Sequence, residues 1–220
     1  DTWRIDGGMY AGRLNMDVDI KGLKGEFVKK VSTSRKFRFL KLYVDRRVWK
    51  NLFVGIGGKG MKSWFDAVNS EDSALIEQAF GEPGDFQWGG VARAFVDTRD
   101  NVFYPYKGGY ASYTFDYNGE NEDFEAYFGN LYDLRYFIKM YSFRYVLALH
   151  LYGKVLSKSA PSNVMQFYGR ALNSAQRGFV TGENYDRNII SSDIEYRYIL
   201  PVLDDRIGLA AFANFGKAYG

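Results

Sequence analysis

The sequence lacks cysteine and has very little histidine and proline. None of its 220 residues is Cys, His150 is the single histidine, and Pro occurs four times. The lack of Cys excludes a disulfide scaffold, a thiolate metal site and a Cys nucleophile, and a lone His excludes multi-histidine metal sites. The acidic residues are scattered and compose no triad or metal cluster. We therefore expect no enzyme, no metal and no cofactor.

The sequence also lacks an excess of charge of one sign and a long hydrophobic run. Its formal net charge is +3, which is too small to indicate binding to nucleic acid, so we expect no nucleic-acid partner. No apolar run approaches the ~20 residues of a membrane-spanning helix. These exclusions leave two classes open, a soluble all-β protein and an outer-membrane β-barrel.

Aromatic residues and a two-residue period are what the sequence has in abundance. Phe, Tyr and Trp make up 18% of the chain. In most segments apolar and polar residues alternate; Tyr132, Leu134 and Tyr136, for example, alternate with Asp133 and Arg135. Successive side chains of a strand point to opposite faces, so these segments predict strands with one apolar and one polar face.

The pattern predicts nine strands joined alternately by short and long links. They span residues 10–20, 36–47, 52–62, 86–97, 108–118, 124–140, 143–155, 187–199 and 206–217. Several exceed the ~5–6 residues usual in soluble sheets and reach the ~9–11 that a transmembrane barrel strand needs. Short turns at one end and long loops at the other, such as 63–85 and 156–186, are typical of such barrels. We expect a short helix over 66–80, with Ser70 or Asp72 as its N-cap.

A soluble sandwich or lipocalin-like barrel also has alternating strands, and the charged face favours the membrane alternative. A soluble barrel fills its interior with its apolar face, whereas here we assign the charged face to a wet lumen. That lumenal face is expected to carry Asp17, Asp19, Arg135, Lys139, Glu195 and Arg197. Leu149 is assigned to the lipid face and His150 to the lumen. Tyrosines near the strand ends are expected to form aromatic girdles; they are Tyr43, Tyr104, Tyr106, Tyr117, Tyr152 and Tyr198.

Two motifs add a resemblance to this pattern. Residues 97–108 read Asp-Thr-Arg-Asp-Asn-Val-Phe-Tyr-Pro-Tyr-Lys-Gly, residues 177–179 read Arg-Gly-Phe, and residues 212–216 read Phe-Ala-Asn-Phe-Gly. Their order, with three strands between the first two motifs, resembles the C-terminal barrel of the outer-membrane assembly-factor superfamily, also called the bacterial surface antigen family. The resemblance covers roughly residues 85–217, whereas residues 1–84 match only as generic barrel strands.

The resemblance implies a location and a function. Members of this family insert polypeptides into the bacterial outer membrane or translocate them across it. We therefore expect an outer-membrane barrel whose partners are the lipid bilayer and client polypeptides or another barrel chain. The alternative is a structural barrel or narrow passive pore that shares the fold without insertase activity.

The first site that the resemblance implies is a periplasmic hairpin turn formed by Asp97, Arg99, Asp100, Pro105 and Gly108. The residues themselves favour a tight turn there. Asp97 and Asp100 are expected to accept hydrogen bonds from local backbone amides, Pro105 fixes its own φ, and Gly108 permits left-handed geometry. A plain structural turn is the alternative interpretation.

The second implied site is a long loop folded into the lumen, with Arg177, Gly178 and Phe179 at its tip. In relatives the Arg of this tip meets polar residues on the two following strands. Here alternation places Asp193 and Glu195 on one face, and Asn214 stands on the next strand where the family usually has Asp. Glu195, or failing that Asp193, is therefore the expected ionic partner of Arg177. A solvated loop with a surface Arg is the alternative.

The whole chain, residues 1–220, is expected to form one antiparallel β-barrel domain, or most of one, with no periplasmic repeat domain. Nine strands are an odd number for a bacterial single-chain barrel, so last strands are missing or neighbouring chains close the sheet. The Gly-rich segment 54–60 superficially resembles a phosphate loop. No helix with Lys-Ser/Thr follows it, so we assign these glycines to the barrel wall.

Overall fold

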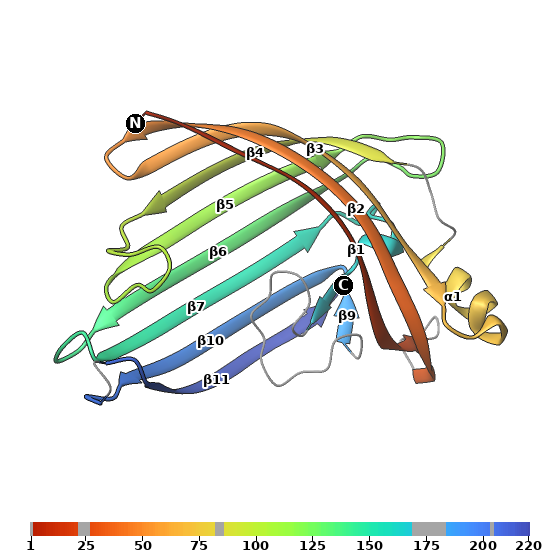
Figure 1. The fold of residues 1–220 in the computed structure, drawn as a ribbon. Coiled ribbons are helices and arrows are strands. Elements are labelled where there is room, and N and C mark those ends of the chain that lie inside the picture. The colour runs from red at the N-terminus through yellow and green to blue at the C-terminus, as the bar shows by residue number, and fades with distance from the viewer. Residues whose placement is uncertain (1, 22–26, 82–85, 169–183, 203–204) are drawn as a thin grey trace.

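One antiparallel sheet dominates the fold of this all-β protein. The computed structural model describes residues 2–21, 27–81, 86–168, 184–202 and 205–220. The sheet joins its strands in the order β1-β2-β3-β4-β5-β6-β7-β10-β11 and curls into a half-barrel (Figure 1). The strands are β1 (Trp3–Lys21), β2 (Phe27–Trp49), β3 (Leu52–Ala67), β4 (Gln87–Asp97), β5 (Gly108–Asn118), β6 (Tyr127–Lys139), β7 (Tyr145–Leu156), β10 (Asn188–Ile199) and β11 (Gly208–Tyr219).

All nine predicted strands are confirmed, but the first three are longer than alternation predicts. Strand β1 begins at Trp3 rather than near residue 10, and β2 begins at Phe27 rather than near residue 36. Gly7 and Gly8 interrupt the alternation at the start of β1, and residues 29–36 of β2 are polar on both faces except for Val31. The bounds of the other strands from β4 onward lie within three residues of the prediction.

Short elements lie in the two longest links between the strands. The first link carries η1 (Ser70–Asp72) and α1 (Ser73–Phe80), and the second carries η2 (Ser162–Val164), β8 (Gln166–Tyr168) and β9 (Asn184–Asp186). Asp72 holds the predicted N-cap position of α1, but its carboxylate binds Lys29 Nζ at 2.6 Å and no backbone amide. In the described part of the chain, no helix has the length and apolarity to cross a membrane.

The two ends of the half-barrel differ in their links. At one end, on the left of Figure 1, lie the links 50–51, 98–107, 140–144 and 200–207. At the other end lie 22–26, 68–86, 119–126 and 157–187, with α1 and β9 among them. We call these the turn end and the loop end. The two longest links, 68–86 and 157–187, both lie at the loop end as predicted, but 98–107 at the turn end is longer than 22–26 and 119–126 at the loop end, so the segregation by length is only partial.

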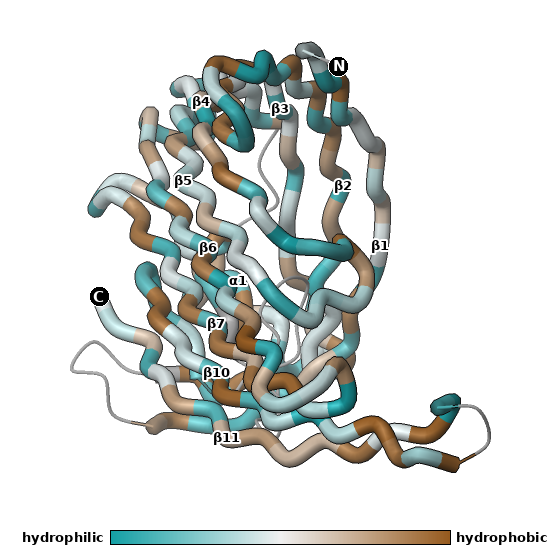
Figure 2. Tube along the Cα trace, turned by 90° about the vertical axis from the view of Figure 1, so that its left-hand side faces the viewer, coloured by the Kyte–Doolittle hydropathy of each residue, from teal (hydrophilic) through white to brown (hydrophobic). Residues whose placement is uncertain are grey.

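The convex face of the sheet is apolar over most of its area. Met9, Ile5 and Ile56 on this face are 83%, 77% and 73% exposed. Other large exposed side chains on the same face are Leu40, Leu42, Val44, Val54, Trp88, Tyr113, Phe115, Tyr117, Phe128, Tyr132, Leu134, Tyr136, Leu151, Ile194, Tyr196 and Phe215. Figure 2 shows hydrophobic and hydrophilic residues alternating along the strands. We call this surface, which Leu149 shares, the apolar belt.

The concave face carries most of the charged side chains of the strands. They are Arg4, Asp6, Arg35, Lys41, Asp45, Lys59, Arg93, Asp97, Asp116, Asp133, Arg135, Lys139, His150, Lys154, Asp193, Glu195 and Arg197. Alternation therefore predicts the inner face correctly for Arg135, Lys139, His150, Glu195 and Arg197. The polarity is the reverse of a soluble barrel, whose interior is apolar.

The loop-end half of β1 has the opposite polarity, so the prediction for Asp17 and Asp19 is wrong. Both acids lie on the convex face, and Met16, Val18 and Ile20 lie on the concave face. The physical reason is α1, which covers the concave face at this end. The three apolar residues join it in a buried cluster whose other members are Val31, Phe65, Ile76, Phe80 and Tyr185. The apolar belt consequently ends near Met9 on β1.

Only some of the tyrosines expected in aromatic girdles lie on the convex face. Tyr117 and Tyr198 lie on the convex face. Tyr43 and Tyr152 are buried on the concave face, because their positions share the face of the charged residues rather than that of the belt. Tyr104 and Tyr106 belong to the link between β4 and β5.

Candidate functional site

The most enclosed charge on the concave face is Asp45, near the turn end. Its side chain is fully buried, and Arg93 of β4 binds it through two hydrogen bonds, Nε to Oδ1 at 2.8 Å and Nη2 to Oδ2 at 2.6 Å. Arg93 Nη1 also lies 3.4 Å from Asp6 Oδ2, and its guanidinium stacks 4.2 Å from the centre of the Tyr43 ring. Such a planar two-point contact fixes both side chains.

Glycines of β3 make room for this cluster. A Cβ on Gly55 would lie 1.9 Å from Asp45 Oδ1, and a Cβ on Gly57 would lie 2.4 Å from Tyr43 Cδ1. Gly55 lies opposite Asp45 on one side and Arg93 on the other. Because Gly55 and Gly57 have no side chains, Arg93 of β4 can reach over β3 and bind Asp45 of β2. This is the structural role of the segment that superficially resembles a phosphate loop.

An acid two residues before an Arg recurs on the concave face. Arg135 binds Asp133 through Nε to Oδ1 at 2.8 Å and Nη2 to Oδ2 at 2.6 Å, and Arg197 Nε binds Glu195 Oε1. Residues two apart share one face of a strand, so each pair needs no partner strand. Lys59 adds a pair between strands, with Nζ 2.8 Å from Asp116 Oδ1.

His150 joins two strands of this network. Its Nε2 lies 3.1 Å from Asp133 Oδ1 on β6, and its Nδ1 lies 3.4 Å from Asp193 Oδ2 on β10. All three side chains are largely enclosed. The concave face therefore carries several separate groups of polar contacts, and in the described part of the chain no group of His, Asp or Glu is arranged to hold a metal.

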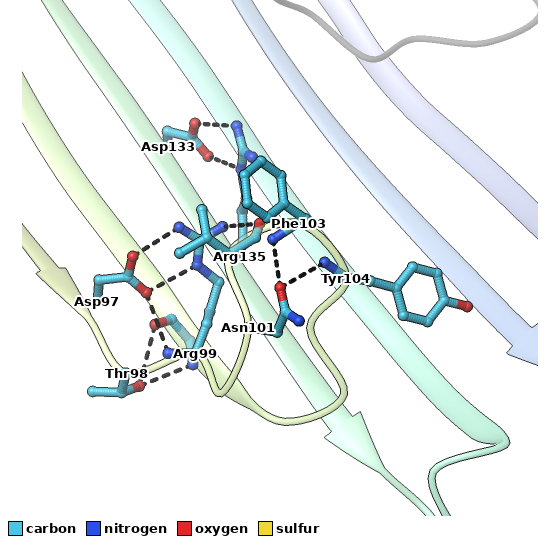
Figure 3. A network of polar contacts seen from close by, with 10 residues as sticks. Asp97, Thr98, Arg99, Asn101, Phe103, Tyr104, Asp133 and Arg135 are labelled. Atoms are coloured by element: carbon cyan, nitrogen blue, oxygen red, sulfur yellow. Dashed lines mark hydrogen bonds and ion pairs between the residues drawn. The ribbon is translucent and has the colours of Figure 1, made fainter.

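The link 98–107 is held by bonds to side chains within it, as Figure 3 shows. The Asp100 carboxylate accepts hydrogen bonds from the backbone N–H of Tyr106 and of Lys107, at 3.0 and 3.2 Å. Asn101 Oδ1 accepts two more, from Phe103 and Tyr104. These backbone-to-side-chain hydrogen bonds take the place of the backbone–backbone hydrogen bonds of a tight hairpin. They give the turn a defined shape.

The two ends of this turn are closed by Asp97 and Gly108. The Asp97 carboxylate accepts from the Arg99 backbone N–H at 3.2 Å and forms a two-point ion pair with its guanidinium. Gly108 has φ of 94°, a left-handed conformation that favours glycine. The hydrogen bonds expected of Asp97 and Asp100 and the geometry expected of Gly108 are thus present.

Charge and hydrogen bonding shift two pKa values in the turn. Desolvation acts to raise the pKa of Asp100, but the N–H groups of Tyr106 and Lys107 outweigh it, and the pKa lies below its usual value. The hydrogen bond with Asp97 is the main cause that raises the pKa of Arg99. Both groups are therefore held in their charged forms.

Aromatic residues of the turn pack onto the concave face. The Arg197 guanidinium of β10 lies 5.3 Å from the centre of the Tyr104 ring. Tyr106 packs against the buried cluster of Phe137, Val146 and Ala148. The turn therefore reaches across the turn end of the half-barrel, which the sequence motif did not predict.

The structure describes only part of the expected loop site. Asp193, Glu195 and Asn214 lie on the concave face, where Asn214 is opposite Asp193. Arg177, Gly178 and Phe179 lie outside the described residues, so their contact with these positions stays a prediction. On the sheet itself, Asp193 contacts His150 and Glu195 contacts Arg197.

Sequence reasoning missed the cluster around Arg93. The signal was present in the strand Val-Gly-Ile-Gly at 54–57, because glycines at alternate positions of a long strand indicate that a neighbouring group crosses it. Comparison with known proteins adds no assignment, since neither the family models nor the curated proteins give a match to this chain.

Proposed function

We propose that the half-barrel forms the wall of an outer-membrane β-barrel. The observation that carries this proposal is the reversed polarity of the sheet. Large apolar side chains such as Ile5, Met9 and Ile56 are exposed on the convex face, and the charged residues line the concave face. A contiguous apolar surface of this extent is costly in water, whereas lipid on the outside and water on the inside suit both faces.

The strand lengths support the same proposal. Strands β4 to β11 of the sheet contain 11 to 13 residues. At ~3.3 Å per residue and a tilt of ~40°, such strands rise about 28–33 Å, enough to cross the ~25 Å apolar band of outer-membrane barrels. The longer β1 to β3 extend past the belt at the loop end, where α1 covers them. This extension suits a part that stands above the membrane in water.

Within this class we propose a factor that inserts or translocates other polypeptides. The support is the turn between β4 and β5, whose sequence resembles the periplasmic hairpin of the assembly-factor superfamily. Its side chains form a compact unit that reaches over the lumen and contacts Arg197. In this proposal the turn end faces the periplasm, and Arg177 holds the long loop in the lumen.

Proteoliposomes test the proposed function. An unfolded outer-membrane barrel protein is added to vesicles that carry this chain, to vesicles that carry an unrelated porin, and to empty vesicles. The proposal predicts faster folding of the added protein only with this chain, measured by heat-modifiable gel mobility. Equal folding rates in all three preparations would contradict it.

The alternative, a narrow passive pore, has one observation in its favour. Charged side chains line the concave face, as in a water-filled lumen. Most of them are paired, as Lys59 is with Asp116 and Arg93 with Asp45, and the turn packs across one end. Steady ion conductance across a planar bilayer without any effect on client folding would favour the pore.

A further inference from the structure

Four cations lie together on the convex face, just past the loop-end border of the apolar belt. Arg13 of β1 lies directly opposite Lys36 of β2, and Arg38 of β2 lies directly opposite Lys62 of β3. Lys36 and Arg38 are two residues apart and so share one face. Two like-charged pairs therefore stand side by side on three adjacent strands. We call these four residues the basic cluster.

Like charges directly opposite each other destabilise a sheet, and the protein compensates only part of this cluster. Asp66 forms an ion pair with Lys36. Arg13 donates from Nε to two neutral acceptors, Asn15 Oδ1 at 3.1 Å and Ser34 Oγ at 2.6 Å. One acid against four cations leaves a net charge of +3.

The other pair of the cluster is Arg38 and Lys62. Within the described part of the chain, no ion pair joins either side chain to a carboxylate. Lys62 Nζ lies 5.9 Å from the centre of the Trp64 ring, and Arg38 is exposed. The unbalanced charge is therefore available to an anion that comes from outside the protein.

The surface toward the turn end from this cluster is apolar and partly hollow. Leu40 and Gly60 follow directly, and then come Leu42 and Gly58. A Cβ on Gly58 would meet nothing closer than 4.0 Å, so the convex surface has a gap between side chains at this position. Next to it lies a shallow apolar groove of about 400 Å³, lined among others by Val44, Ile56, Ala92, Ala94, Tyr113 and Phe115.

We propose that this face binds a phosphorylated lipid of the surrounding bilayer, with its phosphates on the basic cluster and its acyl chains along Leu40, Leu42 and the groove. The inference rests on the proposed membrane location. Arg and Lys suit phosphate because the guanidinium offers a planar two-point contact and the ammonium a point charge. Trp64 beside the cluster lies where indole rings concentrate, at the border between apolar and polar zones. An isolated phosphate would use the cations but not the groove.

Binding of a diphosphorylated glycolipid in neutral detergent tests this proposal. Native mass spectrometry compares the purified chain with Arg38→Ser/Lys62→Ser and with a matched control, Lys139→Ser/Lys217→Ser, which removes two exposed cations outside the basic cluster and the groove. We expect the first variant to bind at least about tenfold more weakly, as the loss of charge-assisted contacts implies. The control should stay within about twofold of the unmodified chain.

Two further arms identify the ligand. The same glycolipid without its phosphates should bind the unmodified chain about as weakly as the phosphorylated form binds the Ser variant. Millimolar inorganic phosphate should not displace the bound lipid, because it lacks the apolar contacts. Equal binding of both glycolipids, equal binding by both variants, or full displacement by inorganic phosphate would overturn the proposal.

Thermal unfolding keeps the test independent of any folding defect. Without lipid, Arg38→Ser/Lys62→Ser should be at least as stable as the unmodified chain, because a like-charged pair is removed. The phosphorylated glycolipid should then raise the Tm of the unmodified chain and not that of the variant. A lower Tm of both this variant and Arg38→Gln/Lys62→Gln would contradict the proposed lipid site.

A chain that enters vesicles but shows no preference for the phosphorylated glycolipid overturns only this inference, whereas failure to enter vesicles overturns the proposed function.

Discussion

Asp100 shows how one carboxylate shapes a whole turn. It accepts hydrogen bonds from two backbone N–H groups six and seven residues farther along the chain. Neighbouring Asn101 repeats this arrangement over a shorter span. Aspartate and asparagine are common in turns for this reason, so the role of Asp100 was predictable from the sequence.

Replacing Asp100 with Ala should loosen the turn while the sheet stays intact. The amides of Tyr106 and Lys107 lose their acceptor and should exchange with solvent several-fold faster, because each loses a hydrogen bond to a carboxylate. Hydrogen exchange at these two amides measures the effect. Glu122→Ala, an exposed acid in the opposite link, is the control, and an equal change in both variants would contradict the assignment.

The same group gives the turn a pH dependence. Because the pKa of Asp100 is lower in the folded protein than in an unfolded chain, its contribution is complete above the unfolded pKa of ~3.9. It is lost as the pH falls through the lower folded value. The protection of the Tyr106 amide, its exchange rate relative to the intrinsic rate at the same pH, should therefore fall below pH ~4 in the unmodified chain and lose this dependence in Asp100→Asn.

Arg177 carries the proposed hold on the long loop. Arg177→Ala should raise the protease sensitivity of residues 156–186 while the barrel stays folded, because a charge-assisted contact in the lumen is lost. Arg177→Lys should restore only part of the protection, since an ammonium has no planar fork. Equal cleavage of all three proteins would mean that the loop is not held by this residue.

Strand β3 takes part in both the ion-pair cluster and the proposed lipid-binding surface. On its concave face the Arg93–Asp45 ion pair passes over Gly55, and on its convex face Gly58 leaves a gap between side chains. Gly55 faces Asp45 on the concave side, and Gly58 faces outward with free space above it. Two glycines three residues apart thus have different reasons to be there.

This difference gives a matched pair of substitutions in β3. Gly55→Ala should destabilise the protein by about 1–3 kcal/mol, because its Cβ displaces the Asp45 carboxylate from Arg93. Gly58→Ala adds the same methyl group to open space and should change the stability by no more than about 0.5 kcal/mol. Urea unfolding followed by Trp fluorescence measures both, and similar losses in the two variants would contradict the described packing.

Alternation in the sequence predicts which segments are strands but not which face lies inside. Leu134 and Leu149 lie on the convex face, as alternation predicts, yet Met16 and Val18 lie on the concave face. Both sets have the same two-residue period, and the difference comes from α1, which packs over β1 from a distant part of the chain. The Arg93–Asp45 pair escaped prediction for the same reason, because it joins strands 48 residues apart.

At the scale of the whole molecule, the sheet separates an apolar outer surface from a charged inner one. Two adjacent residues of β7, Leu149 and His150, lie on opposite surfaces of the sheet. Leu149 lies in the apolar belt, and His150 lies between Asp133 and Asp193. A cation at either position meets a very different environment, although the residues are neighbours in the chain.

Leu149→Arg should impair membrane assembly far more than His150→Arg. An Arg that faces lipid near the bilayer centre costs about 2–4 kcal/mol in such barrels, whereas lumenal positions tolerate charge. At His150 the two carboxylates also receive the new cation. The folded fraction in heat-modifiable gels reports the difference, and equal fractions would show that one of the two faces is misassigned.

The most direct test of the central claim is a cysteine scan along β7 in lipid vesicles, made simple because the chain has no Cys. Residues 146–152 are replaced one at a time and labelled with a nitroxide, and collisions with oxygen and with a water-soluble nickel chelate are measured. The account predicts a two-residue alternation, with oxygen dominant at Leu147, Leu149 and Leu151 and the chelate dominant at His150 and Tyr152. Chelate access to Leu149 equal to that at His150 would contradict the membrane location of the convex face.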